Sequence, residues 1–350
     1  MRDIYIPPEG LYFRLLGYAS KHVLFSRTNA LPEFGHSAEI DDDDASQYFS
    51  LIHGTGKNAG LYAIKGKMTG NVLFSRTHMD PRVGHIGGDG KYGDNWFRIE
   101  PGEGRYLGNF RLVMPSAGVA LFSRTHMEPQ VWNYTANEIH TDHYFSFLFE
   151  AVHVDKVEYD LKLGRIVSSA RRVLASQTFE NRTKQLQSTT LELCESETHS
   201  GMFEYGAGFN LAAGTTLKAA VPEVDETGLT GDPYSNREMR WGERNEFVKK
   251  YVATLRMNAD PGETVRAIAT IQKGEIEVPY TMYLSSEKTG VKLESKGLWR
   301  GVWTWNLRLF IEPAYSHHEL DMIENSTPSR ERKLEFISHS FSTHHRELLQ

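Results

Sequence analysis

The chain has 350 residues, which is enough for two ordinary domains of roughly 100–200 residues each. Apolar residues make up 39% and charged residues 24%, so the composition supports a buried core and excludes disorder of the whole chain. The net charge of −6 offers no basic stripe for phosphate backbones, so we expect no nucleic-acid partner.

The N-terminus and the cysteine count lead to an expectation about location. Residues 1–10 lack the apolar core of a signal peptide, and no run approaches the ~18 consecutive apolar residues of a transmembrane helix. Cys194 is the single cysteine, which excludes an intrachain disulfide. We expect a protein made soluble without a conventional signal peptide, either cytoplasmic or released by another route.

An internal repeat dominates the first 150 residues. The word LFSRT occurs at 24–28, 73–77 and 121–125, with its phenylalanines 49 and 48 residues apart. The same frame surrounds each copy. It consists of an aromatic residue upstream (Phe13, Tyr62, Phe110), a proline downstream (Pro32, Pro81, Pro129) and a later phenylalanine (Phe49, Phe97, Phe145).

Each repeat reads as short strands joined by turns. Apolar runs alternate with clusters of Gly, Pro, Asn and Asp, without helical periodicity. Three units of about 48 residues with about four strands each predict a β-trefoil over residues 1–150, since a propeller needs at least four blades. We expect the repeated aromatic residues in the core. Arg27, Arg76 and Arg124 recur in all three repeats, which favours a structural role.

Two repeats carry side chains suited to a sugar. Asp94-Asn95 and Asp142-His143 stand directly before an aromatic pair, where the first repeat has Ser46-Gln47. A carboxylate accepts two hydroxyl hydrogen bonds, and an exposed aromatic ring stacks on a pyranose. The candidate sugar-binding residues are His78, Gly84, His85, Tyr92, Asp94 and Asn95 in the second repeat, and His126, Trp132, Asn133, Tyr134, Asp142 and His143 in the third. The open alternatives are a loop-stabilising turn at the acidic pairs and loop anchors at Trp132 and Tyr92.

After residue 150 the repeat ends and long alternating segments begin. Residues 203–221 alternate apolar with small or polar residues over 19 positions, whereas an ordinary strand has about 5–6 residues and a membrane-spanning strand about 9–11. Residues 221–226 read as a turn, and the return leg to Trp241 contains Gly228, Gly231, Pro233 and Arg237. Candidate membrane-inserting residues are Phe203, Tyr205, Phe209, Leu211, Leu217 and Val221. The alternative is one long half-buried strand in an elongated sheet.

Several segments together resemble a known fungal family. They are Asp3–Phe13, the three LFSRT repeats, Asp94–Phe97, Pro261–Val265, Tyr283–Ser286 and Gly297–Val302. In order and spacing they resemble the haemolytic pore-forming lectins found in the sulphur-shelf bracket mushroom, over roughly residues 1–308.

The resemblance implies an all-β chain. It would consist of a galactoside-binding β-trefoil at 1–150, an aerolysin-type pore-forming module at 151–308 and a C-terminal tail at 309–350 without a counterpart. The ligands would be galactose-containing glycans such as lactose and N-acetyllactosamine, held through Asp94, Asn95, Asp142 and His143. Family members form homo-oligomers on target membranes and insert a hairpin, which here corresponds to about 198–241.

Other readings of the chain remain as alternatives. The irregular return leg favours an agglutinin or defence lectin whose hairpin is inactive. A trefoil protease inhibitor would leave 151–308 unexplained, and an enzyme would need paired acids that the sequence does not show. We expect no catalytic residues, no metal site and no cofactor, and we expect Cys194 to be a half-buried strand residue.

Overall fold

The computed structural model describes residues 4–28, 30–231 and 237–314. These residues form strands and short 3-10 turns, which confirms the all-β fold class. None of the helical elements in these ranges has the length and apolar character needed to cross a membrane. The chain packs as two units: residues 1–155 with 283–294, and residues 156–282 with the segment from 295 onward.

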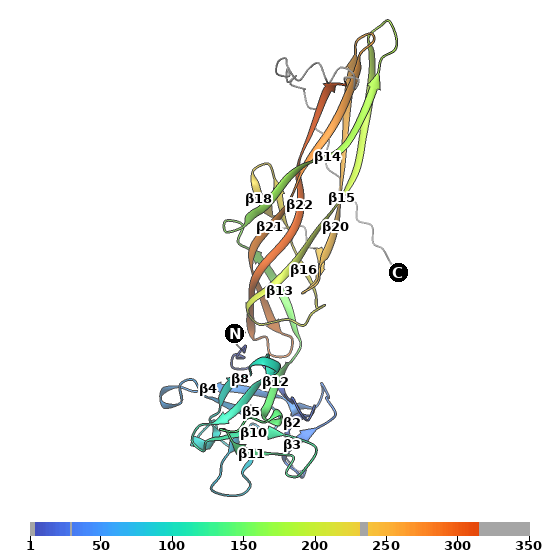
Figure 1. Ribbon diagram of the computed structural model, residues 1–350. Helices are drawn as coiled ribbons and strands as arrows, with labels where there is room; N and C mark the ends of the chain where they lie inside the picture. The colour runs from blue at the N-terminus through green and yellow to red at the C-terminus, as the bar shows by residue number, and fades with distance from the viewer. Residues whose placement is uncertain (1–3, 29, 232–236, 315–350) are drawn as a thin grey trace. The chain divides into compact units, whose positions relative to one another are not determined.

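The first unit consists of three repeats of four strands (Figure 1). The strands are β1 (Phe13–Gly17), β2 (Val23–Ser26), β3 (Phe34–Ser37), β4 (Phe49–His53), β5 (Tyr62–Gly66), β6 (Val72–Ser75), β7 (Val83–Ile86), β8 (Arg98–Pro101), β9 (Phe110–Met114), β10 (Val119–Ser123), β11 (Val131–Thr135) and β12 (Tyr144–Phe149). Short 3-10 turns precede the last strand of each repeat: η1 (Ala45–Gln47), η3 (Gly93–Asn95) and η5 (Thr141–His143). Two others, η2 (Gly56–Asn58) and η4 (Gly104–Tyr106), connect the repeats.

Six of these strands close into a ring. β1 pairs with β4 and β12, β4 with β5, and β9 with β8 and β12, while the bridge between Tyr62 and Phe97 joins the remaining gap. The other six strands form three antiparallel hairpins, β2–β3, β6–β7 and β10–β11. This is the predicted trefoil arrangement.

The repeated side chains lie where the sequence predicts them. Phe13, Phe49, Phe97, Phe110 and Phe145 are fully buried in one core cluster. In every repeat the arginine of LFSRT lies over the phenylalanine two residues earlier and donates from Nε to the carbonyl of the downstream proline, at 3.0–3.1 Å. The structural role predicted for the three arginines is confirmed.

The second unit is built on long strands that run side by side (Figure 1). They are β13 (Val152–Tyr159), β14 (Arg165–Glu180), β15 (Gln187–Gly208), β20 (Asn245–Ala259), β21 (Thr264–Ser286) and β22 (Lys292–Pro313). The sheet order is β13-β21-β22-β15-β20, and β14 pairs with β21. Because β22 continues to Pro313, the sheet extends beyond the predicted boundary at 308. The rest of the predicted tail, from 315 on, lies outside the described residues.

The single long strand expected at 203–221 is wrong. β15 ends at Gly208, which has a φ of +91°, and the chain then folds into β16 (Thr216–Ala219), β17 (Pro222–Asp225), β18 (Gly228–Gly231) and β19 (Arg237–Arg240). β16 pairs with β19 and β17 with β18, so residues 209–231 and 237–241 form a hairpin segment. Its turn is at Asp225–Gly228, not at 221–226. The apolar residues Phe203, Phe209 and Leu211 are buried on both sides of the bend, so the apolar pattern of the sequence does not reveal the break.

Two smaller differences also have local causes. Cys194 is exposed, not half-buried, because it lies on the outward face of β15 opposite Val252 of the edge strand β20. Residues 283–294 pack with the first unit: the backbone N–H of Glu287 donates to the Ala151 carbonyl at 3.0 Å, and Lys288 Nζ donates to the Asp42 carbonyl at 3.1 Å.

Candidate functional site

A hydrogen bond links each trefoil hairpin to its neighbour. Opposite the leucine of LFSRT stand His36, His85 and Asn133 in the three repeats. Each reaches the LFSRT serine of another repeat. His36 Nδ1 lies 2.7 Å from Ser123 Oγ, His85 Nδ1 lies 2.6 Å from Ser26 Oγ, and Asn133 Nδ2 donates to Ser75 Oγ at 2.9 Å. The three serines are fully buried, so this ring of contacts fixes the hairpins around the pseudo-threefold axis.

These contacts change the role of two predicted sugar-binding residues. The His85 side chain is 5% exposed, and Asn133 is 4% exposed with two further bonds to the Arg76 and Arg82 carbonyls. Neither side chain presents a surface to a sugar. Glu33 stands 3.6 Å from His85 Nε2, but full burial of Ser26 keeps this serine–histidine–acid set from acting on a substrate.

The residue after each acidic position is also buried. Asn95 is fully buried, donates from Nδ2 to the Leu73 carbonyl at 3.1 Å, and accepts from the Tyr92 N–H at 3.0 Å. His143 takes the same place in the third repeat and is 1% exposed. Gly84 is required for a related reason: a Cβ there would lie 2.8 Å from the Phe74 ring. Asn95, His143 and Gly84 therefore shape the loops beneath the candidate sites.

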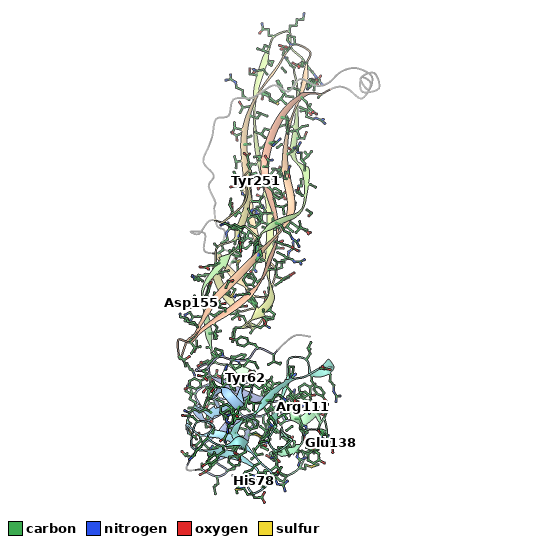
Figure 2. The ribbon with its side chains drawn as sticks, turned by 90° about the vertical axis from the view of Figure 1, so that its left-hand side faces the viewer. Tyr62, His78, Arg111, Glu138, Asp155 and Tyr251 are labelled. Atoms are coloured by element: carbon green, nitrogen blue, oxygen red, sulfur yellow. The ribbon has the colours of Figure 1, made fainter. Side chains whose placement is uncertain are left out.

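The remaining predicted residues are exposed or half-buried side chains of the second and third repeats. The repeat-2 site consists of exposed His78, Tyr92, which is 45% exposed, and half-buried Asp94. The repeat-3 site consists of exposed His126, half-buried Trp132 and Asp142, and Tyr134, which is 49% exposed. Figure 2 shows His78 and Glu138, one from each repeat, at separate places on the surface of the unit.

One carboxylate oxygen of Asp142 accepts no hydrogen bond from the described residues. This oxygen, Oδ1, is buried. His143 Nε2 is 4.0 Å away, but burial lowers the pKa of His143 to about 4, so the imidazole is neutral at pH 7. The His140 ring lies against both His143 and Tyr134, at 5.2 and 5.8 Å between ring centroids. The repeat-3 site therefore offers a carboxylate acceptor beside exposed aromatic rings.

The first repeat lacks such a site for two reasons. Ser46 replaces the aspartate and is buried. Lys288, from the segment that packs with this unit, lies 5.0 Å from the centre of the Tyr48 ring, the counterpart of Trp96 and Tyr144. Lys288 could not be predicted as part of this region, because it lies far outside the repeats.

The candidate membrane-inserting residues are mostly buried in the second unit. Phe203, Phe209, Leu211, Leu217 and Val221 are 0–5% exposed, and Tyr205 is half-buried with its hydroxyl bonded to the Gly208 carbonyl at 2.8 Å. Phe203 packs on Trp299 and Trp241 at 4.7 and 5.8 Å between ring centroids. The hairpin segment thus buries its apolar face against the sheet, while Lys218 and Asn210 on the alternate positions are exposed.

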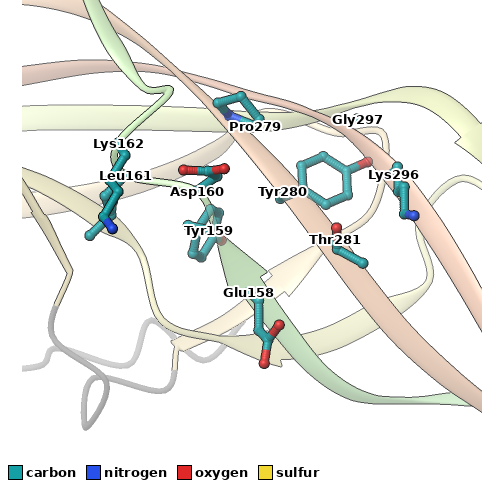
Figure 3. Close-up of a pocket in the computed structure, with 10 residues that line it drawn as sticks. All are labelled: Glu158, Tyr159, Asp160, Leu161, Lys162, Pro279, Tyr280, Thr281, Lys296 and Gly297. Atoms are coloured by element: carbon teal, nitrogen blue, oxygen red, sulfur yellow. The ribbon is translucent and has the colours of Figure 1, made fainter.

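A groove in the second unit has no counterpart in the sequence predictions. Figure 3 shows its ten lining residues around a volume of about 730 Å³. Tyr159 lines it with a buried hydroxyl that has no partner among the described residues, and burial raises the pKa of that hydroxyl. The neighbouring turn contacts the hairpin segment, because Leu161 and Gly164 lie next to Gly231 and Leu229. Across the described residues, no group of three or more ligating side chains is placed to hold a metal ion.

Known proteins were compared with the chain. No protein-family model and no curated protein matches it. Among solved structures, the BEL β-trefoil shares 40% identity over 41% of this chain and 96% of its own length, with a TM-score of 0.39. The first unit belongs to the β-trefoil family.

Two other solved structures are similar to larger shares of the chain. A lamprey immune protein is 15% identical over 89% of this chain and 97% of its own, with a TM-score of 0.38. An aerolysin-like protein from Bombina maxima is 10% identical over 46% of this chain and 98% of its own, with a TM-score of 0.32.

Proposed function

We propose that this β-trefoil protein is a lectin for galactose-containing glycans that oligomerises on target membranes and inserts the hairpin segment to form a β-barrel pore. The observation that carries the sugar-binding part is the repeat-3 site. It combines a carboxylate with an uncommitted buried oxygen and exposed aromatic rings. The proposal involves no catalysis, no metal and no cofactor. It places the action of the protein at the surface of the target cell.

The sugar would bind by its hydroxyls and its apolar face. Asp94 and Asp142 would each accept two hydroxyl hydrogen bonds, which are stronger than neutral ones because the acceptor is charged. Tyr92 and Tyr134, each about half exposed, would stack on the pyranose ring of the sugar. His78 and His126, which are exposed, would contact the sugar from a neighbouring loop. Two sites on one unit raise avidity on a glycan-covered surface, since the second contact is effectively intramolecular.

The pore-forming part is supported by the hairpin segment. Its alternate residues are buried and exposed, the pattern that a barrel strand presents to lipid and to the lumen. In lipid, every backbone N–H and C=O needs a partner, so inserted hairpins would have to close into a barrel of several copies. Release from the sheet would expose Leu211, Leu217 and Val221, which are buried in this structure.

The second candidate function is an agglutinin with an inactive hairpin. It is favoured by the return leg, where Arg237 stands within 3.7 Å of Glu223 and adds charge to the segment. Pro233, the other feature that favours it, lies outside the described residues.

Dye release from galactolipid liposomes, with and without excess lactose, tests the proposal. Release that lactose blocks, and that is lost in the double variant Asp94→Asn/Asp142→Asn, supports both parts. Lactose-sensitive binding without release supports the agglutinin. Binding that lactose does not affect contradicts the galactoside assignment.

A further inference from the structure

His199 lies at the junction where β15 changes partners. Residues 187–201 of β15 pair with β20, and residues 200–208 pair with β22. His199 is directly opposite Phe247 of β20 and one residue before the first pair with β22. β15 ends nine residues later, at Gly208, where the hairpin segment begins, and the chain returns to the sheet in β20 at Asn245, so His199 stands at the base of the segment.

The surroundings of His199 require a neutral ring. The side chain is 2% exposed, and its Nε2 accepts from the backbone N–H of Thr304 at 3.3 Å. Thr304 Oγ1 also contacts Nε2 at 2.5 Å and Tyr251 Oη at 2.7 Å. A proton on Nε2 would face the Thr304 N–H, so the charged ring loses this bond. The ring also lies 4.2 Å from the Trp303 ring centre.

The charges around this ring add to the cost of protonation. Three cations act on it from three strands: Lys249 of β20, Arg237 of β19 and Lys273 of β21. The anion on its own strand, Glu197, is buried and already bonded to Lys273 and to Arg172 of β14. Burial, with these cations, lowers the pKa of His199 to about 3.

One of these cations belongs to the hairpin segment. The Arg237 guanidinium lies 5.0 Å from the centre of the Phe247 ring, and Phe247 is the residue paired with His199. Its Nη2 is 3.7 Å from Glu223 of β17, the negative group facing it within the segment. Arg237 therefore ties the return leg of the hairpin to the strand position next to the histidine. The same arginine interrupts the apolar face of the return leg in the sequence.

We propose that His199 and Arg237 form an acid-sensitive latch that holds the hairpin segment on the sheet. Protonation of His199 Nε2 removes the acceptor of the Thr304 backbone N–H, places a positive charge beside Arg237 and favours the state in which residues 209–231 and 237–241 have left the sheet. In that state His199 is exposed to water and titrates like a free histidine. The inference rests on the proposed pore-forming function only for its biological use, because the release itself occurs without a membrane.

Linkage gives the size of the effect. The released state binds one proton more tightly than the closed state. The equilibrium constant for release therefore rises by about tenfold for each pH unit once the pH is well below the free histidine pKa of ~6.5. Because the free histidine is already half protonated at pH 6.5, the constant rises about 50-fold between pH 6.5 and 4.5.

Hydrogen exchange of the full-length protein tests the latch. Residues 209–231 and 237–241 are followed from pH 7.5 to 4.5, with labelling times scaled for the intrinsic pH dependence of exchange. Wild-type protein should open these residues about 50-fold more at pH 4.5 than at 6.5, and His199→Gln should abolish the response. Arg237→Gln should raise opening already at pH 7.5, because it removes the contact with Phe247, and this keeps the test decisive if the His199→Gln sheet fails to form. His36→Asn, which removes a half-buried histidine of the first unit whose pKa is also lowered by burial, is the matched control and should respond like wild type.

Two outcomes would overturn the latch. One is opening that is independent of pH in the wild type, and the other is equal opening of wild type and Arg237→Gln at pH 7.5. Dye release is measured separately on the same preparations. Acid-induced opening without dye release contradicts the pore-forming function and leaves the latch intact.

Discussion

The substitution Asn133→Ala separates a positioning role from direct sugar contact. Asn133 is 4% exposed and donates from Nδ2 to Ser75 Oγ and to the carbonyls of Arg76 and Arg82, at 2.9, 3.0 and 3.3 Å. Truncation removes this donor from a fully buried serine oxygen and from two loop carbonyls, of which the Arg82 carbonyl keeps its bond from the Arg76 N–H at 2.8 Å. Because each unsatisfied buried group costs about 1–3 kcal/mol and these three share one donor, we expect a loss of about 3 kcal/mol of folding free energy.

For a unit of about 150 residues, 1 kcal/mol lowers the unfolding temperature by roughly 2–4 °C, so the expected shift is roughly 6–12 °C. Scanning calorimetry of the full-length chain measures it, and Tyr134→Phe, a neighbour that is 49% exposed, serves as the stability control. Galactoside affinity should fall only modestly in Asn133→Ala, through loosening of the 76–82 loop. An unchanged unfolding temperature together with lost galactoside binding would refute the positioning role.

The remaining predictions concern the carboxylates, the hairpin contact and acid stability. Asp142→Asn should lower galactoside affinity about tenfold or more in titration calorimetry, since a hydrogen bond to a charged group contributes about 1.5–3 kcal/mol, whereas Ser46→Ala should not change it. Gly164→Ala places a Cβ 2.6 Å from Leu229 Cδ1 and should speed hydrogen exchange of residues 222–231. Gly231→Ala, whose Cβ would lie 3.6 Å from Leu161 Cδ1, should keep the wild-type rate, and equal rates in the two variants would argue against this contact. The lowered pKa of His143, about 4, means that its contribution to stability is complete above pH 6.5 and is lost as the pH falls towards 4. Urea denaturation measures the free energy of unfolding at pH 7 and at pH 4.5. In His143→Asn the decrease between these two pH values should be smaller than in the wild type by about 2–3 kcal/mol. An unchanged pH dependence would count against a neutral buried ring.

The trefoil could be predicted from the sequence because its information is local and repeated. Three copies of LFSRT, each with its aromatic residues and its proline, fix the strands, the core and the arginine contacts within about 48 residues. The exposed members of the two candidate sites, such as Tyr92 and Tyr134, also follow from their place in that frame.

The distinction between exposed and buried members of the sites could not be predicted. His85 and Asn133 are polar residues in register with the sugar-site candidates, but their partners Ser26 and Ser75 lie 59 and 58 residues away on neighbouring hairpins. Lys288 reaches the first repeat from 246 residues beyond Asp42. Such contacts exist only once the chain has closed.

The hairpin segment shows the same division between sequence and tertiary structure. The sequence by itself determined the alternation of apolar and polar residues from 203 to 221, because that pattern is a property of neighbouring positions. The tertiary structure alone decided that β15 stops at Gly208 and that the segment folds back as four short strands. The physical reason is that alternation specifies which face of a strand is buried, whereas the direction of the chain depends on which distant surface, here the sheet around Trp299 and Phe203, is available to cover that face.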